Sequence, residues 1–570
     1  MTREKTMTGY ASVDKPWLKY YSDEAINAEI PSLTMYEYAY EINKEHLDDV
    51  AMVYQNRKLT YRYVFEQIDK LAEKFAAKGV KEGDIVTILS LNTPETIYLF
   101  YALNKIGAIA CMEYVTQTKE SLKKALDTTK PKMVIILNLF MRMFEEVIAE
   151  YEGEVIVISP VELLSAPVRM LVHAKMKIAK THFRNVMSYK TFITGKGKKV
   201  SIESQANRPA VLLSTSGSTG IPKKVVLTNR NINSIAVQYK VSGMNINRND
   251  KFIAMAPPFH AFGISLGIHL PLCCGVLCII STDPSPDKSA ELFAKYNPNL
   301  FLGAVDHIIK IIENPDVNRL DLSDLHTIAV GGETMSDKLR DDVNAFLKAH
   351  NVKGKLVTGY GMSELAGTAV TEKTGVWRDG SVGIPQSLVT VKIVDINTNE
   401  ECKYGVEGEI LISSPAMMQE YVNNQEETVK AIEVDVNGTK WIHTGDLGYI
   451  DEDGFVFVKG RLKRIYTTLD MVTGQTYKLF PDYIESELDK IPFVSRSAVL
   501  VIEDDTRMHV AVAFLRMKEI KDNWEEETVH ILKKELPAYD IPVKFFIVND
   551  LPLLSSGKVD YRKLEEMYSL

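Results

Sequence analysis

The stretch STSGSTGIPKK, residues 214–224, follows directly on the apolar run Ala210-Val211-Leu212-Leu213. It contains two glycines, five hydroxyl side chains, one proline and two lysines. Small residues allow backbone N–H groups to turn toward a bound anion, because no bulky side chain stands in the way. A short buried strand that ends in such a loop indicates an anion-binding site. From this stretch alone, a loop that holds no ligand stays open.

Two common phosphate-binding motifs do not account for this loop. A Walker-type loop has Gly, four residues and then Gly-Lys-Ser/Thr, but counting from Gly217 leads to Pro222 and counting from Gly220 leads to Val225. The dinucleotide pattern G-x-G-x-x-G is also absent from the loop. The usual P-loop NTPase and the Rossmann oxidoreductase are therefore excluded as explanations.

Length and composition describe a large globular protein. The chain has 570 residues, 45% hydrophobic and 25% charged, which suggests several domains with sizeable cores. A net charge of −8 gives no global electrostatic case for a nucleic-acid partner. The charged N-terminus predicts no signal peptide and a cytoplasmic location. The longest apolar run, 268–280, is shorter than the ~20 residues of a membrane span, and we expect a buried strand pair with core thiols there rather than a transmembrane segment.

From about Thr60 the pattern alternates between helix and strand. Apolar residues recur at helical spacing after Thr60, which can cap the helix, and Gly79 can end it. The run 85–89 then reads as a buried strand, and Thr93 with Pro94 starts a further helix. Repeated units of this kind predict an α/β fold with a largely parallel, helix-covered sheet.

The segment 163–202 is strongly basic in an acidic protein. It contains nine Lys or Arg residues and no acidic residue, and its first half mixes lysines with apolar residues as a surface-lying amphipathic helix would. We expect a solvated excursion on the rim of a domain. Docking to an acidic partner, or peripheral contact of 169–199 with anionic lipid, stays open.

The sequence changes character near its end. Residues 451–454 form a hairpin-like turn between two apolar runs, and the basic stretch 459–464 that follows has few apolar residues. We expect a hinge at 460–464. Beyond it, strand-like runs at 498–502 and 509–514 and a helix from about 525 to 536 predict a compact α+β module.

Seven motifs occur in the order found in one known family. They are TSGSTGIPKK (215–224), APPFHAFG (256–263), VGGE (330–333), TGYGMSE (358–364), WIHTGDLG (441–448), KGRLKR (459–464) and LPLLSSGKVDYRKL (551–564). Together they resemble the adenylate-forming superfamily of acyl-CoA synthetases, firefly luciferases and peptide-synthetase adenylation domains. The resemblance runs from about Thr34 to the C-terminus. It implies a large multilobed N-terminal domain (1–459), a hinge (460–464) and a small mobile α+β C-terminal domain (465–570).

The resemblance also implies a reaction. A carboxylate oxygen attacks the α-phosphorus of ATP, pyrophosphate leaves, and a thiol then captures the acyl-adenylate. The cofactors implied are ATP, Mg²⁺ and coenzyme A, or the phosphopantetheine arm of a carrier protein. Backbone amides, hydroxyls and one ammonium of the glycine loop would stabilise the leaving pyrophosphate.

The family's site residues carry over position by position. The phosphate loop would comprise Thr215, Ser216, Gly217, Ser218, Thr219, Gly220 and Lys223, and the adenine slot Gly331, Gly332, Glu333, Tyr360, Gly361 and Met362. Asp446 would accept hydrogen bonds from the ribose hydroxyls, with Arg461 beside the same sugar. Glu364 would hold Mg²⁺ and the Ser363 hydroxyl would face the α-phosphate. Lys558 would bridge carboxylate and α-phosphate, and Lys463 would be the hinge residue about which the C-terminal domain turns.

The sequence departs from the family pattern at several positions. Lys224 replaces a glycine, and we expect it to add charge beside the phosphates; Asn229 replaces a histidine and Ser363 a threonine. The segment 465–480 is longer than usual, with Thr467 where relatives often have a basic residue. Since this segment borders the thiol tunnel in relatives, it bears on the second half-reaction.

His260 bears on the choice of acid. Amino-acid-activating relatives have an aspartate for the α-amino group at this position, whereas an imidazole beside Phe259 and Phe262 suits a fatty, aryl or other organic acid. A core histidine satisfied by backbone is the plain alternative. The leading hypothesis is an acid–thiol ligase that uses coenzyme A. A stand-alone adenylation enzyme that loads an acyl carrier protein, and a non-catalytic nucleotide-binding relative, are the alternatives.

Overall fold

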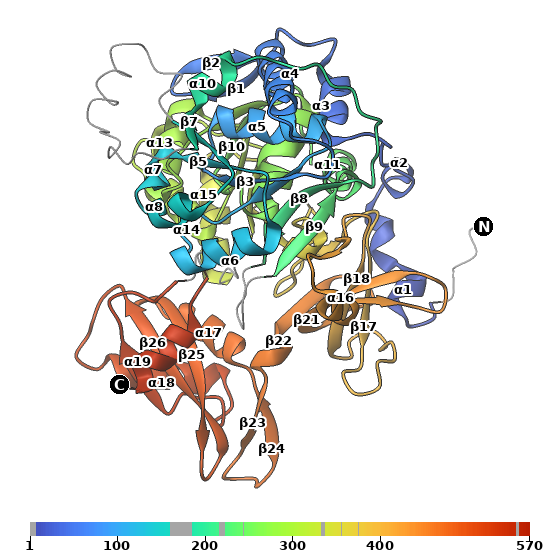
Figure 1. Ribbon diagram of the computed structural model, residues 1–570. Coiled ribbons are helices and arrows are strands. Elements are labelled where there is room, and N and C mark those ends of the chain that lie inside the picture. Colours follow the sequence, from blue (N-terminus) through green and yellow to red (C-terminus); the bar gives the residue numbers. More distant parts are fainter. Residues whose placement is uncertain are drawn as a thin grey trace.

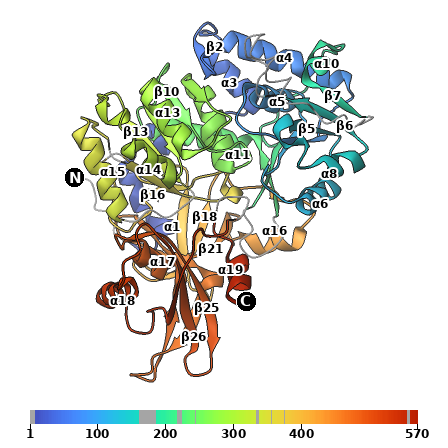
Figure 2. The same ribbon diagram turned by 90° about the vertical axis from the view of Figure 1, so that its left-hand side faces the viewer.

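The computed structural model describes residues 7–159, 185–215, 223–242, 244–331, 337–354, 356–373, 375–553 and 558–569. Within these ranges the strands form two large sheets, one five-stranded sheet and two small C-terminal sheets (Figure 1). Figure 2 shows the two large sheets as separate helix-covered lobes that lie side by side above the C-terminal part of the chain.

The first large sheet carries the two ends of the glycine loop. In the described residues its spatial order is β19 (Glu420–Tyr421), β9 (Lys224–Thr228), β8 (Pro209–Ser214), β4 (Ile109–Met112), β3 (Ile85–Leu89), β5 (Met133–Leu137), β6 (Glu154–Ile158) and β7 (Val186–Ser188). The six strands from β8 to β7 are parallel, whereas β9 runs antiparallel to β8. The two ends of the glycine loop therefore lie side by side, with Ser214 paired to Lys224.

The second large sheet carries the adenine-slot motifs. In the described residues its order is β16 (Ile384–Pro385), β15 (Val370–Thr371), β14 (Leu356–Tyr360), β13 (Thr327–Gly331), β12 (Leu300–Gly303), β10 (Lys251–Ala254), β11 (Leu277–Ile280), β1 (Val50–Tyr54) and β2 (Arg57–Thr60). Strands β14 to β1 are parallel. Since β13 and β14 end side by side, their motifs meet at one edge.

Helices cover these sheets. The described ones before the hinge are α1 (Ala11–Asp14), η1 (Pro16–Tyr20), α2 (Asp23–Ile26), α3 (Met35–Asn43), α4 (Tyr61–Ala77), α5 (Pro94–Lys105), α6 (Lys119–Thr129), α7 (Asn138–Met141), α8 (Glu145–Glu150), α10 (Tyr189–Thr194), α11 (Asn229–Val241), η2 (Gly263–His269), α12 (Leu270–Cys274), α13 (Pro286–Tyr296), α14 (Val305–Glu313), η3 (Val317–Arg319), α15 (Asp337–Ala349), η4 (Ser363–Leu365) and α16 (Gln425–Ala431). Two predicted starts are confirmed: the side chain of Thr60 accepts a hydrogen bond from the Tyr63 amide, and Thr93 caps α5 with Pro94 as its first residue.

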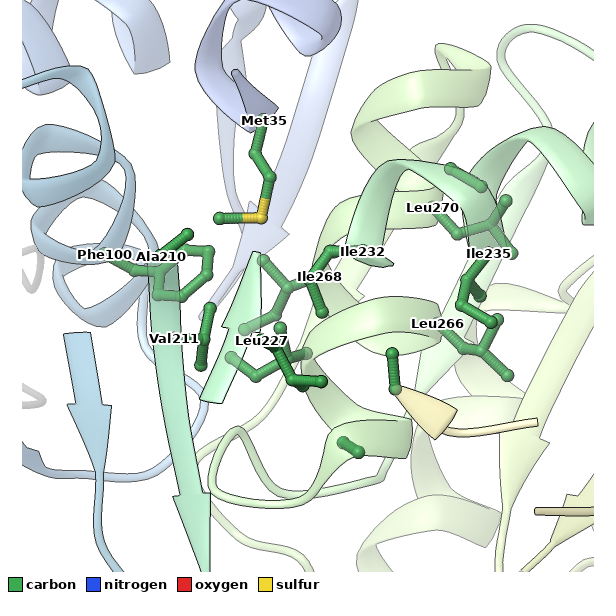
Figure 3. Packing of buried hydrophobic residues seen from close by; sticks show 14 of the residues in the cluster. Met35, Phe100, Ala210, Val211, Leu227, Ile232, Ile235, Leu266, Ile268 and Leu270 are labelled. Atoms are coloured by element: carbon green, nitrogen blue, oxygen red, sulfur yellow. The ribbon is translucent and has the colours of Figure 1, made fainter. Parts of the chain in front are cut away.

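Apolar side chains from both lobes share one core. Ile232 and Ile235 of α11 and Leu266 of η2 pack together, and Val211 and Leu227 of the first sheet belong to the same cluster (Figure 3). These five side chains are all buried. The core holds the two sheets, and hence the motifs at their edges, in a fixed relation.

The prediction of a buried strand pair at 268–280 is wrong. Residues 263–269 form a π-helix that continues into α12, and only Leu277–Ile280 is a strand. The segment packs against α11 and α3, and a helix buried on all sides has the same uninterrupted apolar sequence as a buried strand. The described cysteines are free thiols, and Cys273 lies 3.3 Å from Nε2 of the buried His269.

A five-stranded sheet leads into the C-terminal part. In the described residues it contains β17 (Thr390–Val394), β18 (Gly408–Ser413), β21 (Lys440–Ile450), β20 (Ile432–Val434) and β22 (Val456–Arg461). The predicted hairpin at 451–454 is confirmed, because β22 pairs antiparallel with β21. Strand β22 continues into η5 (Leu462–Arg464), at the position of the expected hinge.

The C-terminal module lies below the lobes and beside β21 and β22 (Figures 1 and 2). Its described elements are β23 (Tyr466–Leu469), β24 (Thr476–Leu479), α17 (Pro481–Asp489), β25 (Val494–Asp504), β26 (Met508–Met517), α18 (Trp524–Glu535), β27 (Lys544–Ile547) and α19 (Tyr561–Ser569). The long segment after the hinge is the β23–β24 hairpin. The predicted fold, a large α/β part with a small α+β part, is confirmed, whereas the exact domain limits stay a prediction.

Candidate active site

Side chains from three strands meet at Asp446, which belongs to β21. The Tyr360 hydroxyl at the end of β14 donates a hydrogen bond of 2.5 Å to Oδ2 of Asp446, and Nε of Arg461 at the end of β22 lies 3.0 Å from Oδ1. Asp446 is buried, with an exposed fraction of 4%. These three residues, which the resemblance assigns to the nucleotide site, therefore lie together, and their roles toward a nucleotide stay predictions.

The charge of Lys558, from the C-terminal module, acts on the same site. Burial raises the pKa of Asp446, and the positive charges of Arg461 and Lys558 act against that rise. The charge of Lys558 also acts on His260. The charge of the predicted lysine is thus felt at both the carboxylate and the imidazole, although it follows the hinge by almost a hundred residues in the sequence.

His260 lies in an aromatic pocket before η2. Its ring centroid is 5.1 Å from that of Tyr114 and 5.0 Å from that of Phe259, and the Tyr114 hydroxyl lies 3.5 Å from Nδ1. Burial, followed by the charge of Lys558, lowers the pKa of His260 to about 4. The imidazole is therefore neutral at pH 7 and offers no counter-charge to an α-ammonium group.

Glu364 lies in η4, directly after the loop that follows β14. Its Oε1 accepts a hydrogen bond of 2.7 Å from the Tyr421 hydroxyl, and its exposed fraction is 6%. The ammonium of Lys223 lies 4.3 Å from the centre of the Tyr421 ring and 3.1 Å from Glu427. Sequence reasoning missed Tyr421, because no motif surrounds this tyrosine on the short edge strand β19.

The two ends of the glycine loop are tied together. The amide of Thr215 donates to the carbonyl of Lys223 at 2.8 Å, and the amide of Lys223 donates to the Thr215 hydroxyl at 3.1 Å. The predicted loop residues Ser216, Gly217, Ser218, Thr219 and Gly220 lie outside the described residues, as do Gly332 and Glu333 of the predicted adenine slot.

The sequence predicted that Lys224 adds charge beside the phosphates, and this prediction is wrong. Its side chain points into the core, where it forms an ion pair with Glu113 and donates a hydrogen bond of 2.8 Å to the Ser214 hydroxyl. The side chains are 7% exposed in Lys224 and 1% exposed in Glu113. An opposite charge on Glu113, which directly follows β4 two strands away in the sheet, determines this orientation and is invisible in the local motif.

Most of the remaining predicted residues lie on the strands and loops next to Tyr360, and Lys463 lies on η5. Gly331 ends β13 opposite Gly359, and a Cβ atom at Gly331 would lie 3.0 Å from the Phe262 ring. Gly361 must be glycine, because a Cβ atom there would lie 2.0 Å from the Gly367 carbonyl oxygen. The carbonyl of Met362 accepts hydrogen bonds from the amides of residues 365 and 367. Ser363 opens η4, and Lys463 is exposed on η5.

Side chains from both large lobes and from the five-stranded sheet form these contacts: Tyr360 and Arg461 with Asp446, and Tyr421 with Glu364. A family model for AMP-binding enzymes matches residues 40–422, and one for the C-terminal domain of AMP-binding enzymes matches 483–558. The chain belongs to the AMP-binding enzyme family, in the adenylate-forming, acyl-CoA synthetase-like superfamily, as its motifs had suggested.

Curated relatives and solved structures cover nearly the whole chain. A long-chain-fatty-acid–CoA ligase of Bacillus subtilis (strain 168) is 26% identical over 97% of this chain and 98% of its own length. A 4-coumarate–CoA ligase of Humulus lupulus is 27% identical over 89% of this chain and 87% of its own length. An anthranilate CoA ligase in complex with anthranoyl-AMP has a TM-score of 0.80 at 20% identity, covering 94% of this chain and 98% of its own.

A further solved structure is an o-succinylbenzoate coenzyme A synthetase from Bacillus subtilis in complex with ATP and a magnesium ion. It has a TM-score of 0.75 at 22% identity and covers 93% of this chain and 99% of its own. At this identity the likeness concerns the fold. In the part of the chain that is described, we find no helix with the length and apolar character of a membrane span.

Proposed function

We propose that the protein activates a carboxylic acid with ATP to form an acyl-adenylate and pyrophosphate, and then transfers the acyl group to coenzyme A. The protein is an AMP-forming acid–thiol ligase by family and by its curated relatives. The observation that carries the proposal is the contact of Tyr360 and Arg461 with the buried carboxylate of Asp446, on which the charge of Lys558 also acts.

In the first half-reaction an oxygen of the acid attacks the α-phosphorus and the bond to the pyrophosphate oxygen breaks. In this proposal the ammonium of Lys558 holds the incoming carboxylate and the α-phosphate together, and the influence of its charge on both Asp446 and His260 supports this role. Asp446 would hold the ribose. The carboxylate of Glu364, oriented by Tyr421, fits a hard divalent ion, and Mg²⁺ bound there would neutralise phosphate charge.

In the second half-reaction the thiol sulfur attacks the acyl carbon, AMP leaves, and the thiol proton passes to solvent. We propose that residues 1–459 and 465–570 act as two domains joined by 460–464, and that the second domain turns about Lys463 between the half-reactions. The neutral imidazole of His260 beside Tyr114 and Phe259 favours an acid without an α-ammonium group, such as a fatty, aryl or other organic acid.

The test follows both half-reactions. Purified protein is assayed for pyrophosphate release with ATP, Mg²⁺ and a panel of fatty, benzoic and cinnamic acids, with and without coenzyme A. Lys558→Ala should lose acyl-adenylate formation yet still convert supplied acyl-adenylate to thioester. The matched control is Lys563→Ala, which removes an exposed lysine of the same module.

Three results would contradict the proposal or part of it. Equal loss of both steps in Lys558→Ala would argue against the role of that lysine. If pyrophosphate is released but the thioester forms only on a carrier protein, the acceptor is the carrier protein and not coenzyme A. No release with any acid would favour a non-catalytic nucleotide-binding protein.

A further inference from the structure

Asp482, in the first turn of α17, contacts the chain on both sides of Lys463. Its Oδ2 accepts a hydrogen bond of 3.0 Å from the backbone amide of Arg461. Its Oδ1 forms an ion pair with Nη1 of Arg464. One carboxylate therefore bridges the last residue of β22 and the last residue of η5.

The backbone at the start of the hinge is shaped for this contact. A Cβ atom at Gly460 would lie 2.9 Å from Oδ2 of Asp482, closer than such atoms approach one another. A residue with a side chain would push the carboxylate away from the Arg461 amide. The glycine of the KGRLKR motif thus has a local physical role in admitting Asp482.

The same helix is connected to the segment that carries Lys558. One turn after Asp482, the carboxylate of Glu485 accepts hydrogen bonds of 3.0 and 3.1 Å from the Tyr561 hydroxyl and lies 2.9 Å from Nη2 of Arg464. The guanidinium of Arg464 lies 3.8 Å from the centre of the Tyr561 ring. Since Tyr561 follows Lys558 by three residues, α17 fixes the hinge and the lysine segment as one unit.

Arg461, whose amide binds Asp482, also belongs to the candidate active site. The side chain of Arg461 is paired with Asp446 and donates a hydrogen bond of 3.1 Å to the Thr444 carbonyl. The bond from the Arg461 amide to Asp482 therefore joins the site in the large domain directly to α17. Because Asp482 and Arg464 both follow Lys463, a rotation about Lys463 moves them together and separates Asp482 from Arg461.

We propose that Asp482 is a positioning residue that latches the hinge in the pose of this structure, in which Arg461 is paired with both Asp446 and Asp482. This inference rests on the proposed function, because it assigns the latched pose to acyl-adenylate formation. The latch must open before the C-terminal domain turns for thioester formation. Loss of the latch should therefore slow the first half-reaction and leave the second unchanged.

The test compares Asp482→Asn with wild type in both half-reactions, using the acid that gives the highest pyrophosphate release. Loss of a charge-assisted hydrogen bond of this kind changes an equilibrium or a rate by about tenfold. We expect acyl-adenylate formation to fall about tenfold and thioester formation from supplied acyl-adenylate to stay within about twofold. Gly460→Ala should reproduce this pattern, because it displaces the same carboxylate. Asp550→Asn is the control, since Asp550 belongs to the same domain and its side chain is 81% exposed.

Limited trypsin cleavage after Arg461 and Lys463 provides a readout that needs no substrate. Asp482→Asn and Gly460→Ala should be cleaved about tenfold faster there than wild type, and Asp550→Asn should not. An equal fall in both half-reactions, or unchanged cleavage, would overturn the latch. If wild type activates no acid, the proposed function fails, while the cleavage rates still decide whether Asp482 holds the hinge.

Discussion

Replacement of Lys224 by methionine is expected to destabilise the large domain, because it leaves a carboxylate buried without its partner. Lys224 begins β9, and its ammonium is paired with Glu113, which directly follows β4. Glu113 also accepts a hydrogen bond of 3.3 Å from the Gln117 amide group. The pair joins the two strands immediately beside the end of the glycine loop.

The magnitude follows from burial. Removing one partner of a buried ion pair costs about 3–5 kcal/mol, whereas replacing both partners by apolar groups of similar size is often neutral or stabilising. With an unfolding entropy of about 2.1 cal/mol/K per residue over roughly 400 cooperative residues, the melting temperature should fall by about 4–6 °C. The double variant Lys224→Met/Glu113→Met should recover most of that loss.

The assay is a double-mutant cycle of thermal unfolding, followed by circular dichroism, on Lys224→Met, Glu113→Met and the double variant. Lys123→Met is the control, because Lys123 forms an ion pair with Glu150 whose side chains are 57% and 61% exposed, and it should not shift the transition measurably. Additive single effects, or an unchanged melting temperature in Lys224→Met, would show that the pair does not stabilise the fold.

Two further predictions concern single carboxylates. Asp446→Asn keeps the shape of the side chain but removes the charge paired with Arg461. We therefore expect kcat/KM for ATP to fall about 100-fold in the pyrophosphate assay. A change below about threefold would contradict the role of Asp446. Asp540 is 5% exposed, its Oδ1 has no hydrogen-bond partner among the described residues, and burial raises its pKa to about 7. The folded state then holds a proton that the unfolded state loses, so stability should fall as the pH rises from about 4 to about 7. Asp540→Asn should remove this dependence and raise the unfolding temperature at pH 8, and parallel pH profiles for the two proteins would refute this.

The sequence predicted well where local rules act. Thr60 and Thr93 cap the helices that they were expected to cap, because N-cap chemistry needs only a side chain and the next three residues. The motifs around Tyr360 and Asp446 lie side by side, as the order of the family motifs suggested, whereas the roles of these residues stay predictions. The apolar run at 268–280 was misread, because a helix and a strand that are buried on every side have the same composition.

The sequence by itself determined the family and the caps of individual helices, because motif spacing and cap chemistry depend on neighbours within a few residues. Tertiary structure alone decided the partner of each charge: Glu113 takes Lys224 into the core, Tyr421 orients Glu364, and Asp482 bridges the hinge. Each of these contacts joins residues on separate elements. Coulomb attraction and burial depend on distance in space, and only the packed fold sets that distance.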